Sequence, residues 1–253
     1  MSPRRDLARR AIGLIDLTDL SDDHAADGMG ELCRRARLHR TAGVCVWPEF
    51  VATCAAHLRG SGVRVATVVN FPTGDEPISK VIDATRLALG DGADDIDLVL
   101  PYSAFLSGQV EQAAEMVSSI AAMIERPRML KVILESGVYP ELAAVTAAAR
   151  LAIEAGADFL KTSTGKVGRG ATLEAAQAML VEIAQADRVV GLKPSGGIRS
   201  FDDASAYLAL ADGVMGDGWA IPSTFRFGAS GLLDALLGEL GELGNAPPAS
   251  RAY

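Results

Sequence analysis

Residues 156–166 read GADFLKTSTGK and residues 92–100 read GADDIDLVL, so one signature occurs twice in the chain. In each, a Gly-Ala-Asp turn leads from a helix into a short run of Phe, Leu, Ile or Val, which is typical of a buried strand. Six further apolar runs alternate with longer stretches of helical periodicity. Eight strand-helix units in 253 residues predict a closed barrel, so the predicted fold class is α/β, a single-domain (β/α)8 TIM barrel.

A third lead-in of the same kind, Ala211-Asp212-Gly213, places the eighth predicted strand. No linker divides the body of the chain, so we expect one barrel domain over residues 1–243. Residues 244–253 are rich in Ala and Pro and are predicted to form a flexible C-terminal tail. The predicted strands are Leu14–Leu17, Gly43–Trp47, Arg64–Asn70, Asp95–Leu100, Leu130–Glu135, Asp158–Thr162, Val189–Lys193 and Gly213–Met215.

Composition excludes several classes of protein. The formal net charge of −8 argues against binding to nucleic acid or to an anionic membrane, since both need a basic face. The three cysteines lack a C-x-x-C spacing, so neither a disulfide framework nor a zinc ribbon is indicated. The first residues lack the apolar segment of a signal peptide, and no run is long enough to span a membrane. We therefore expect a cytoplasmic protein.

Two lysines stand at the ends of predicted strands, Lys161 in ADFLKTSTGK and Lys193 in VVGLKPSGG. A lone lysine at a strand end usually points to water. Two lysines that face each other across one cavity are a different case. Burial and repulsion between the two ammonium groups lower the pKa of the amine, and the neutral amine is the nucleophile of Schiff-base chemistry. This pair therefore favours covalent catalysis.

Asp97 interrupts the apolar run Ile96-Asp97-Leu98-Val99. A carboxylate inside a barrel strand is costly unless it is paired, and Lys161 and Lys193 are the cations available to it. The alternation of side chains predicts that Ile96 and Leu98 face the helices. Asp97 is then either a structural ion-pair partner or a proton relay through water, and one ion pair would serve both roles.

Three loops of small residues are predicted to bind a phosphate group. Barrels commonly hold phosphate in the loops after the seventh and eighth strands, where backbone N–H groups and a helix N-terminus face the anion. The predicted phosphate-binding residues are Thr164, Gly165 and Lys166 in one loop, Gly196, Gly197 and Arg199 in the second, and Gly228 and Ser230 in the third, where Phe227 to Ser230 open the last helix.

The segments IDLTDLSDD, VATVVNFPTG, ADDIDLVLPY, LKVILESG, ADFLKTSTGK, VGLKPSGGIR and FRFGAS occur in this order. Together they closely resemble the deoxyribose-phosphate aldolase family, over about Asp16 to Leu240. The resemblance implies a class I aldolase that reversibly cleaves 2-deoxy-D-ribose 5-phosphate to acetaldehyde and D-glyceraldehyde 3-phosphate. Its partners would be small phosphorylated sugars and aldehydes, with no metal and no other cofactor, and a homodimer is left open.

The resemblance also assigns roles to residues. Lys161 matches the Schiff-base lysine, Lys193 the second lysine that favours the neutral amine, and Asp97 the proton relay. Asp16 and Thr18 fall near the substrate hydroxyl. Tyr253 matches a C-terminal tyrosine of longer bacterial members and is a hypothetical proton relay. Two positions depart from the pattern of some members and would loosen anion binding, namely Ser103 and Gly231.

Two other functions remain open from the residues alone. A phosphosugar isomerase on the same barrel would use a carboxylate base, for which Glu135 is available, but would leave the second lysine without a role. A non-catalytic phosphate-binding barrel would not need a buried amine pair. Trapping of an imine with borohydride separates these alternatives from the aldolase.

Overall fold

The structure, a computed structural model, describes residues 3–22 and 26–242. The predicted tail and Tyr253 lie outside the described residues. None of the described helices is long and apolar enough to cross a bilayer. The strands are β1 Ile15–Asp19, β2 Gly43–Val46, β3 Arg64–Val69, β4 Asp95–Val99, β5 Met129–Ile133, β6 Phe159–Lys161, β7 Gly191–Lys193 and β8 Phe227–Ala229.

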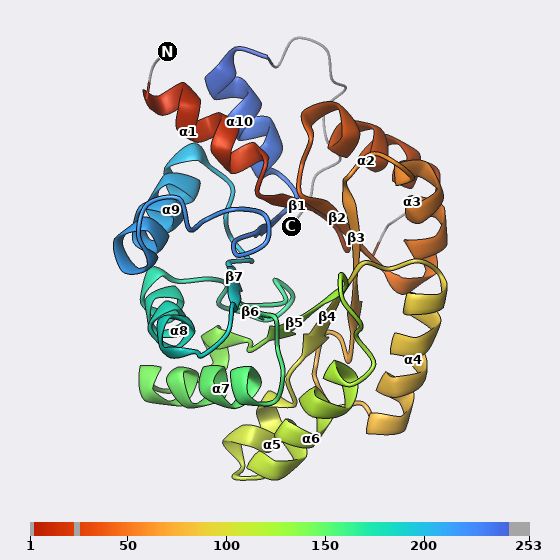
Figure 1. The fold of residues 1–253 in the computed structure, drawn as a ribbon, viewed down its shortest axis with the longest axis vertical. Coiled ribbons are helices and arrows are strands. Elements are labelled where there is room, and N and C mark those ends of the chain that lie inside the picture. The colour runs from red at the N-terminus through yellow and green to blue at the C-terminus, as the bar shows by residue number, and fades with distance from the viewer. Residues whose placement is uncertain (1–2, 23–25, 243–253) are drawn as a thin grey trace.

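Helices follow the strands and surround them, as Figure 1 shows. They are α1 Pro3–Ile12, α2 Ala26–His39, α3 Val51–Leu58, α4 Ile78–Gly90, α5 Tyr102–Leu106, α6 Val110–Ala121, α7 Leu142–Glu154, α8 Leu173–Gln185, α9 Phe201–Met215 and α10 Leu232–Leu240, with the short 3-10 turns η1 Pro48–Phe50 and η2 Ser136–Val138. Seven of the eight predicted strands are confirmed to within a few residues at their ends.

All eight strands belong to one parallel sheet in the order β7-β6-β5-β4-β3-β2-β1-β8. Isolated parallel bridges join Leu192 to Phe225 and Ser195 to Gly228, so the sheet closes between β7 and β8. The chain is therefore a (β/α)8 TIM barrel. The repeated Gly-Ala-Asp turns owe their glycines to backbone geometry, because Gly92 and Gly156 have φ angles of +100° and +110°.

The eighth strand was predicted in the wrong place. Residues 213–215 are the last turn of α9, and β8 is formed by residues 227–229, which the sequence assigned to a helix start. A capping box on Ser200 starts α9, and its Ala- and Leu-rich pattern continues to Met215. The true strand has only three residues with a glycine at its centre, so its sequence carries little strand signal.

Side-chain alternation sorts the barrel into two layers. Ile96 and Leu98 belong to the large apolar core between strands and helices, as predicted. The interior of the barrel instead contains charged side chains, with Asp95, Asp97 and Lys131 all fully buried. A small apolar cluster of Leu20, Cys45, Ala66 and Val68 fills one side of the interior. The polar residues of the barrel thus share one interior, where each must find a partner.

Candidate active site

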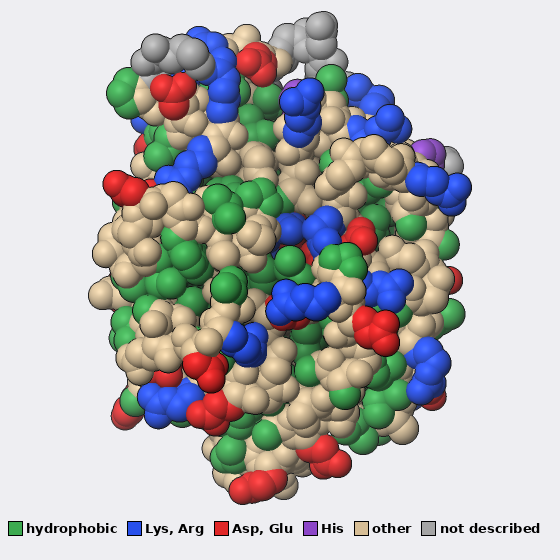
Figure 2. Space-filling model, in the orientation of Figure 1, with side chains coloured by type: hydrophobic (Ala, Val, Ile, Leu, Met, Phe, Trp, Pro, Cys, Tyr) green, Lys and Arg blue, Asp and Glu red, His purple; other side chains and the backbone are tan. Residues whose placement is uncertain are grey.

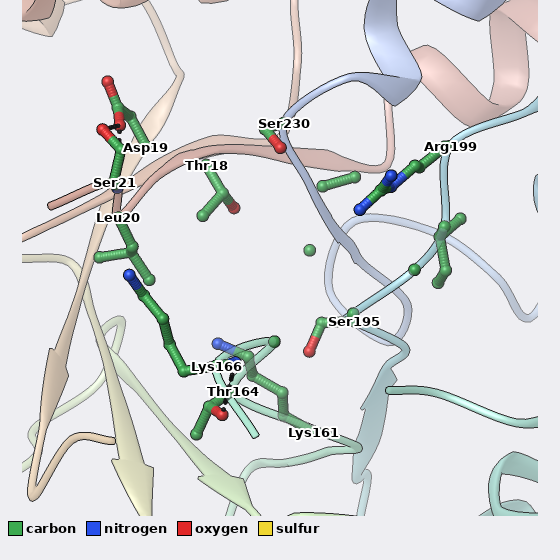
Figure 3. A pocket seen from close by; sticks show the side chains of 16 residues that line it. Thr18, Asp19, Leu20, Ser21, Lys161, Thr164, Lys166, Ser195, Arg199 and Ser230 are labelled. Carbon is green, nitrogen blue, oxygen red and sulfur yellow. Dashed lines mark hydrogen bonds between the residues drawn. The ribbon is translucent and has the colours of Figure 1, made fainter. Parts of the chain in front are cut away.

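A pocket opens at the carboxyl ends of the strands, where barrels of this type carry their chemistry. In Figure 3 the side chains surround an open centre, with Thr18 and Ser230 across from Lys161 and Thr164. Ten of the thirteen predicted site residues within the described part of the chain line this pocket. These are Thr18, Lys161, Thr164, Gly165, Lys166, Gly196, Gly197, Arg199, Gly228 and Ser230.

The other three lie beneath the pocket. Asp97 is fully buried, and its Oδ2 atom accepts hydrogen bonds from Lys161 Nζ and from Lys193 Nζ, each at 2.8 Å. Lys193 is fully buried as well, whereas Lys161 keeps 3% exposure and borders the pocket. Two amines therefore share one carboxylate oxygen directly below an open cavity.

Asp16 is placed differently from the prediction. It is fully buried, does not line the pocket, and pairs through Oδ2 with Lys193 at 2.6 Å. Its other oxygen, Oδ1, accepts from Arg226 Nη1 at 2.6 Å. Asp16 thus holds Lys193 from below, while Thr18 from the same strand reaches the pocket.

A second buried ion-pair group lies toward the amino ends of the strands. Lys131 Nζ is 2.6 Å from Asp95 Oδ2 and 3.4 Å from Asp97 Oδ1. Arg64 binds the other oxygen of Asp95, with Nη2 at 2.6 Å. Lys131 therefore links the lower group to Asp97, and the charged interior forms one connected network.

Electrostatics fixes the charge of the partners around Lys161. Burial alone would raise the pKa of Asp97, but Lys161, Lys193 and Lys131 outweigh it and hold the pKa well below the ordinary value. Burial would lower the pKa of Lys193, but Asp16 and Asp97 together raise it above the ordinary value. Lys193 is therefore a cation and Asp97 an anion throughout the neutral pH range.

The three small-residue loops meet above the lysines. The Ala171 N–H donates to the Gly196 carbonyl at 3.0 Å, and the Gly228 N–H donates to the Pro194 carbonyl at 2.9 Å. Gly228 also gives Lys193 its room, since a Cβ atom there would lie 3.1 Å from Lys193 Cε and 2.7 Å from the Ser195 side chain. The loops form one surface lined by small residues.

Positive charge and helix geometry converge on this surface. Lys166 and Arg199 border the pocket from two loops, and α10 begins at Leu232, just after Ser230. The free N–H groups of a helix start favour a bound anion. On the face drawn in Figure 2, several basic side chains lie near the centre, some of them next to acidic ones. The pocket is therefore suited to an anionic group.

The two departures from the family pattern lie outside this lining. Ser103 is exposed on α5 and Gly231 caps α10, and neither borders the pocket. Within the described residues, no group of three or more His, Cys, Asp or Glu side chains could hold a metal ion.

Sequence reasoning missed two contributors and gave a third another role. Arg226, inside the quoted FRFGAS segment, pairs with Asp16, and Asp95 pairs with Lys131. Glu135, considered as the base of an isomerase, accepts hydrogen bonds from Thr164. A charged residue within a buried apolar run was the available signal for Arg226 and Asp95.

Comparisons with known proteins agree with this geometry. The model of the DeoC/LacD family aldolases matches residues 10–233. Deoxyribose-phosphate aldolase of Agrobacterium fabrum is 47% identical over 239 residues, covering 93% of this chain and 92% of that protein. The tetrameric deoxyribose phosphate aldolase of Aeropyrum pernix has a similar fold, with a TM-score of 0.76 at 25% identity, covering 93% of this chain and 92% of that one. The aldolase QR15 gives a TM-score of 0.79 at 27% identity, over 91% and 96%.

Proposed function

The chain belongs to the DeoC/LacD family of aldolases, and we propose that it is a class I aldolase acting through a Schiff base on Lys161. The reaction is the reversible cleavage of 2-deoxy-D-ribose 5-phosphate to acetaldehyde and D-glyceraldehyde 3-phosphate, which makes the protein a carbon–carbon lyase. The observation that carries the proposal is the sharing of Asp97 Oδ2 by two lysine amines below a pocket suited to an anion.

The balance of charge supports Lys161 as the nucleophile. The buried network joins three carboxylates to five cationic side chains, so it holds more positive than negative groups. Among its three lysines, Lys161 alone has a single carboxylate partner and alone borders the pocket. Its amine therefore faces the substrate, and in its neutral form it is the nucleophile that Schiff-base chemistry needs. Besides its three lysines, the network consists of Asp16, Asp95, Asp97, Arg64 and Arg226.

The first step joins amine and aldehyde. Neutral Lys161 Nζ attacks the aldehyde carbon C1 of the open-chain sugar, and uptake of one proton with loss of one water molecule leaves an iminium between Nζ and C1. Lys193, held as a cation by Asp16 and Asp97, does not compete for the aldehyde. Its ammonium group binds the same Asp97 oxygen as the Lys161 amine.

The second step breaks the bond between C2 and C3. The electron pair of that bond moves into the iminium and forms an enamine, while the C3 hydroxyl loses its proton and becomes the aldehyde of glyceraldehyde 3-phosphate. Asp97, an anion beneath Lys161, is the proposed proton acceptor through a water molecule. Protonation of the enamine carbon and hydrolysis of the new imine then release acetaldehyde and restore Lys161.

The distant phosphate orients the sugar for both steps. The side of the pocket proposed to receive the phosphate is lined by Lys166, Arg199, Ser230 and four loop glycines, Gly165, Gly196, Gly197 and Gly228, and α10 begins just after Ser230. Binding energy at a group that does not react holds C1 near Lys161, which is a recognised source of rate enhancement.

The isomerase alternative has less support. Its carboxylate base would be Glu135, but this side chain is fully buried, does not line the pocket and already accepts two hydrogen bonds from Thr164.

Further proposals concern assembly, location and the C-terminus. We propose that the chain forms an oligomer, with a homodimer as the simplest form, because the Aeropyrum pernix relative is described as a tetramer. The acidic net charge and the cysteine pattern support a cytoplasmic location. Residues 244–253 are proposed to be a tail beyond a barrel domain of residues 1–243, with Tyr253 as a proton relay to the enamine carbon.

Borohydride trapping tests the function directly. The protein is incubated with acetaldehyde and sodium borohydride, and the adduct is located by peptide mass. We expect one reduced adduct, on Lys161. An adduct on another lysine, or no adduct while the protein turns over 2-deoxyribose 5-phosphate, contradicts the proposal.

A further inference from the structure

The loop between β6 and α8, residues 162–172, carries three of the proposed phosphate-binding residues and is clamped on two sides. On one side it lies against the β7–α9 loop. A Cβ atom on Gly170 would lie 2.3 Å from the Gly196 carbonyl oxygen, and Ala171 donates a hydrogen bond to that same oxygen. Residues 170 and 171 therefore pack directly against the β7–α9 loop.

On the other side the loop is held by Glu135, at the end of β5. Glu135 Oε2 accepts hydrogen bonds from the Thr164 N–H at 3.0 Å and from Thr164 Oγ1 at 2.5 Å. Thr164 Oγ1 in turn accepts from the Lys166 N–H at 3.0 Å. One carboxylate oxygen thus fixes Thr164 directly and the Lys166 backbone through a single hydroxyl.

The turn after Glu135 reinforces the same contact. A Cβ atom on Gly137 would lie only 2.2 Å from the Arg169 carbonyl oxygen, so η2 packs directly against the far part of the loop. The Ser136 N–H also donates to the Thr162 carbonyl at 2.7 Å. The segment 135–137 therefore contacts the loop at its start, middle and far part.

This arrangement is costly for Glu135. Its side chain is fully buried, burial raises its pKa, and its φ angle of +56° lies in the left-handed region that favours glycine. Oε1 has no hydrogen-bond partner among the described residues. Strained or incompletely paired buried residues are found most often at functional sites. Glu135 does not border the pocket, but Thr164, which donates both hydrogen bonds to it, does.

We propose that Glu135 is a positioning residue for the phosphate end of the substrate, which sets the preference for phosphorylated over free sugars. By holding Thr164 and the Lys166 backbone, it fixes the position of the segment 164–166, which lines the pocket proposed to receive the phosphate. This inference rests on the proposed function, since it assigns a specificity role within that site.

The test compares two substrates in matched variants. Glu135→Ala removes both hydrogen bonds to Thr164, and Glu135→Gln is its control, because an amide oxygen accepts the same two bonds. The Gln NH₂ group replaces Oε1, to which no described residue donates. Both variants carry the same backbone strain. KM and kcat are measured with 2-deoxyribose 5-phosphate and with free 2-deoxyribose.

We expect Glu135→Ala to raise KM for the phosphorylated sugar by about 10-fold or more, the scale of one or two lost hydrogen bonds to a charged acceptor. The loss on free 2-deoxyribose should stay below about threefold, and Glu135→Gln should recover most of the difference. Equal losses on both substrates would reduce Glu135 to a structural residue. A Gln variant as impaired as the Ala variant would mean that the charge itself is needed, and would overturn the positioning role.

A second pair of variants leaves the strained residue untouched. Thr164→Val removes the hydroxyl that links Glu135 to the Lys166 backbone, and Thr164→Ser keeps it. Val should show the same selective rise in KM, whereas Ser should not, and equal behaviour of the two contradicts the linkage. Equilibrium titration with inorganic phosphate repeats both comparisons without turnover. Failure of the aldolase reaction, seen as absence of the Lys161 adduct, is thereby separated from failure of this inference.

Discussion

The two ends of the barrel interior are both charged, but they are charged in different ways. At the amino ends of the strands, Asp95 is matched by Lys131 and Arg64 at 2.6 Å each. At the carboxyl ends, Lys161 and Lys193 converge on a single oxygen of Asp97. Each end holds one more cation than carboxylates, but at the upper end one of the lysines, Lys161, borders the active-site pocket.

The two ends of the interior therefore have different roles, because one stabilises the fold and the other carries out the reaction. Paired buried charges cost little once formed but a great deal to separate, so they fix the strands that carry them. Lys161, in contrast, has a single carboxylate partner and borders the pocket, where a neutral amine is a nucleophile. The same residue type therefore serves structure at Lys131 and chemistry at Lys161, and substitutions should affect the two lysines in opposite ways.

The largest expected effect is on turnover. Lys161→Arg keeps a cation near Asp97 but cannot supply a neutral amine, so kcat/KM should fall by more than about 10⁴-fold, equivalent to about 5.5 kcal/mol. The measurement is steady-state cleavage of 2-deoxyribose 5-phosphate, with circular dichroism to verify the fold. Lys80→Arg, on the exposed face of α4, is the matched control and should retain full activity. Substantial turnover by Lys161→Arg would refute the assignment.

The next effect is on stability. Here we expect substitution of Lys131 to cost more than substitution of Lys161. Lys131→Met removes the nearest cation of Asp95 Oδ2 and Asp97 Oδ1, and should lower the free energy of unfolding by about 3–5 kcal/mol. Lys161→Met leaves Asp97 paired with Lys193 and Lys131, so it should cost less than Lys131→Met. Urea denaturation compares the two variants. If both lose the same stability, the distinction between the two ends is wrong.

Lys193 should act through its charge. Its raised pKa means that it remains a cation across the neutral range, and that charge opposes protonation of Lys161. Lys193→Leu removes the repulsion, so the acidic limb of the pH–rate profile should move to higher pH. Near neutrality the rate should fall by about 10²-fold, which corresponds to a displacement of about two pH units. An acidic limb at its original pH would show that the two amines are not coupled.

The smallest of these effects concerns the rim of the pocket. Gly197 has a φ angle of +89° and open space around it, so Gly197→Ala measures the backbone strain alone. Gly197→Glu adds a carboxylate beside the proposed phosphate site and should raise KM for 2-deoxyribose 5-phosphate a further ~10-fold, the scale of like-charge repulsion near a surface. Free 2-deoxyribose, which lacks the anion, should respond equally to Ala and Glu. A Glu-specific loss on both sugars would place the phosphate elsewhere.

Much of the fold follows from local patterns in the sequence. The apolar runs of seven strands, the Gly-Ala-Asp turns and the helical periodicity are properties of neighbouring residues, and they predicted the barrel. The same local reasoning placed Lys161, Lys193 and Asp97 at strand ends and interiors. Local reasoning failed at β8. The three residues around Gly228 form a strand because they pair with β1 and with Ser195 just after β7.

The sequence by itself determined that two lysines and an aspartate would share a barrel interior below three small-residue loops. Only the tertiary structure decided how they are paired. Asp97 meets Lys161 across 64 residues and Lys193 across 96, and Arg226 meets Asp16 across 210. Which oxygen each cation takes, and which amine faces the pocket, depends on strand register and on closure of the barrel. These are set by packing over the whole chain, so no local pattern records them.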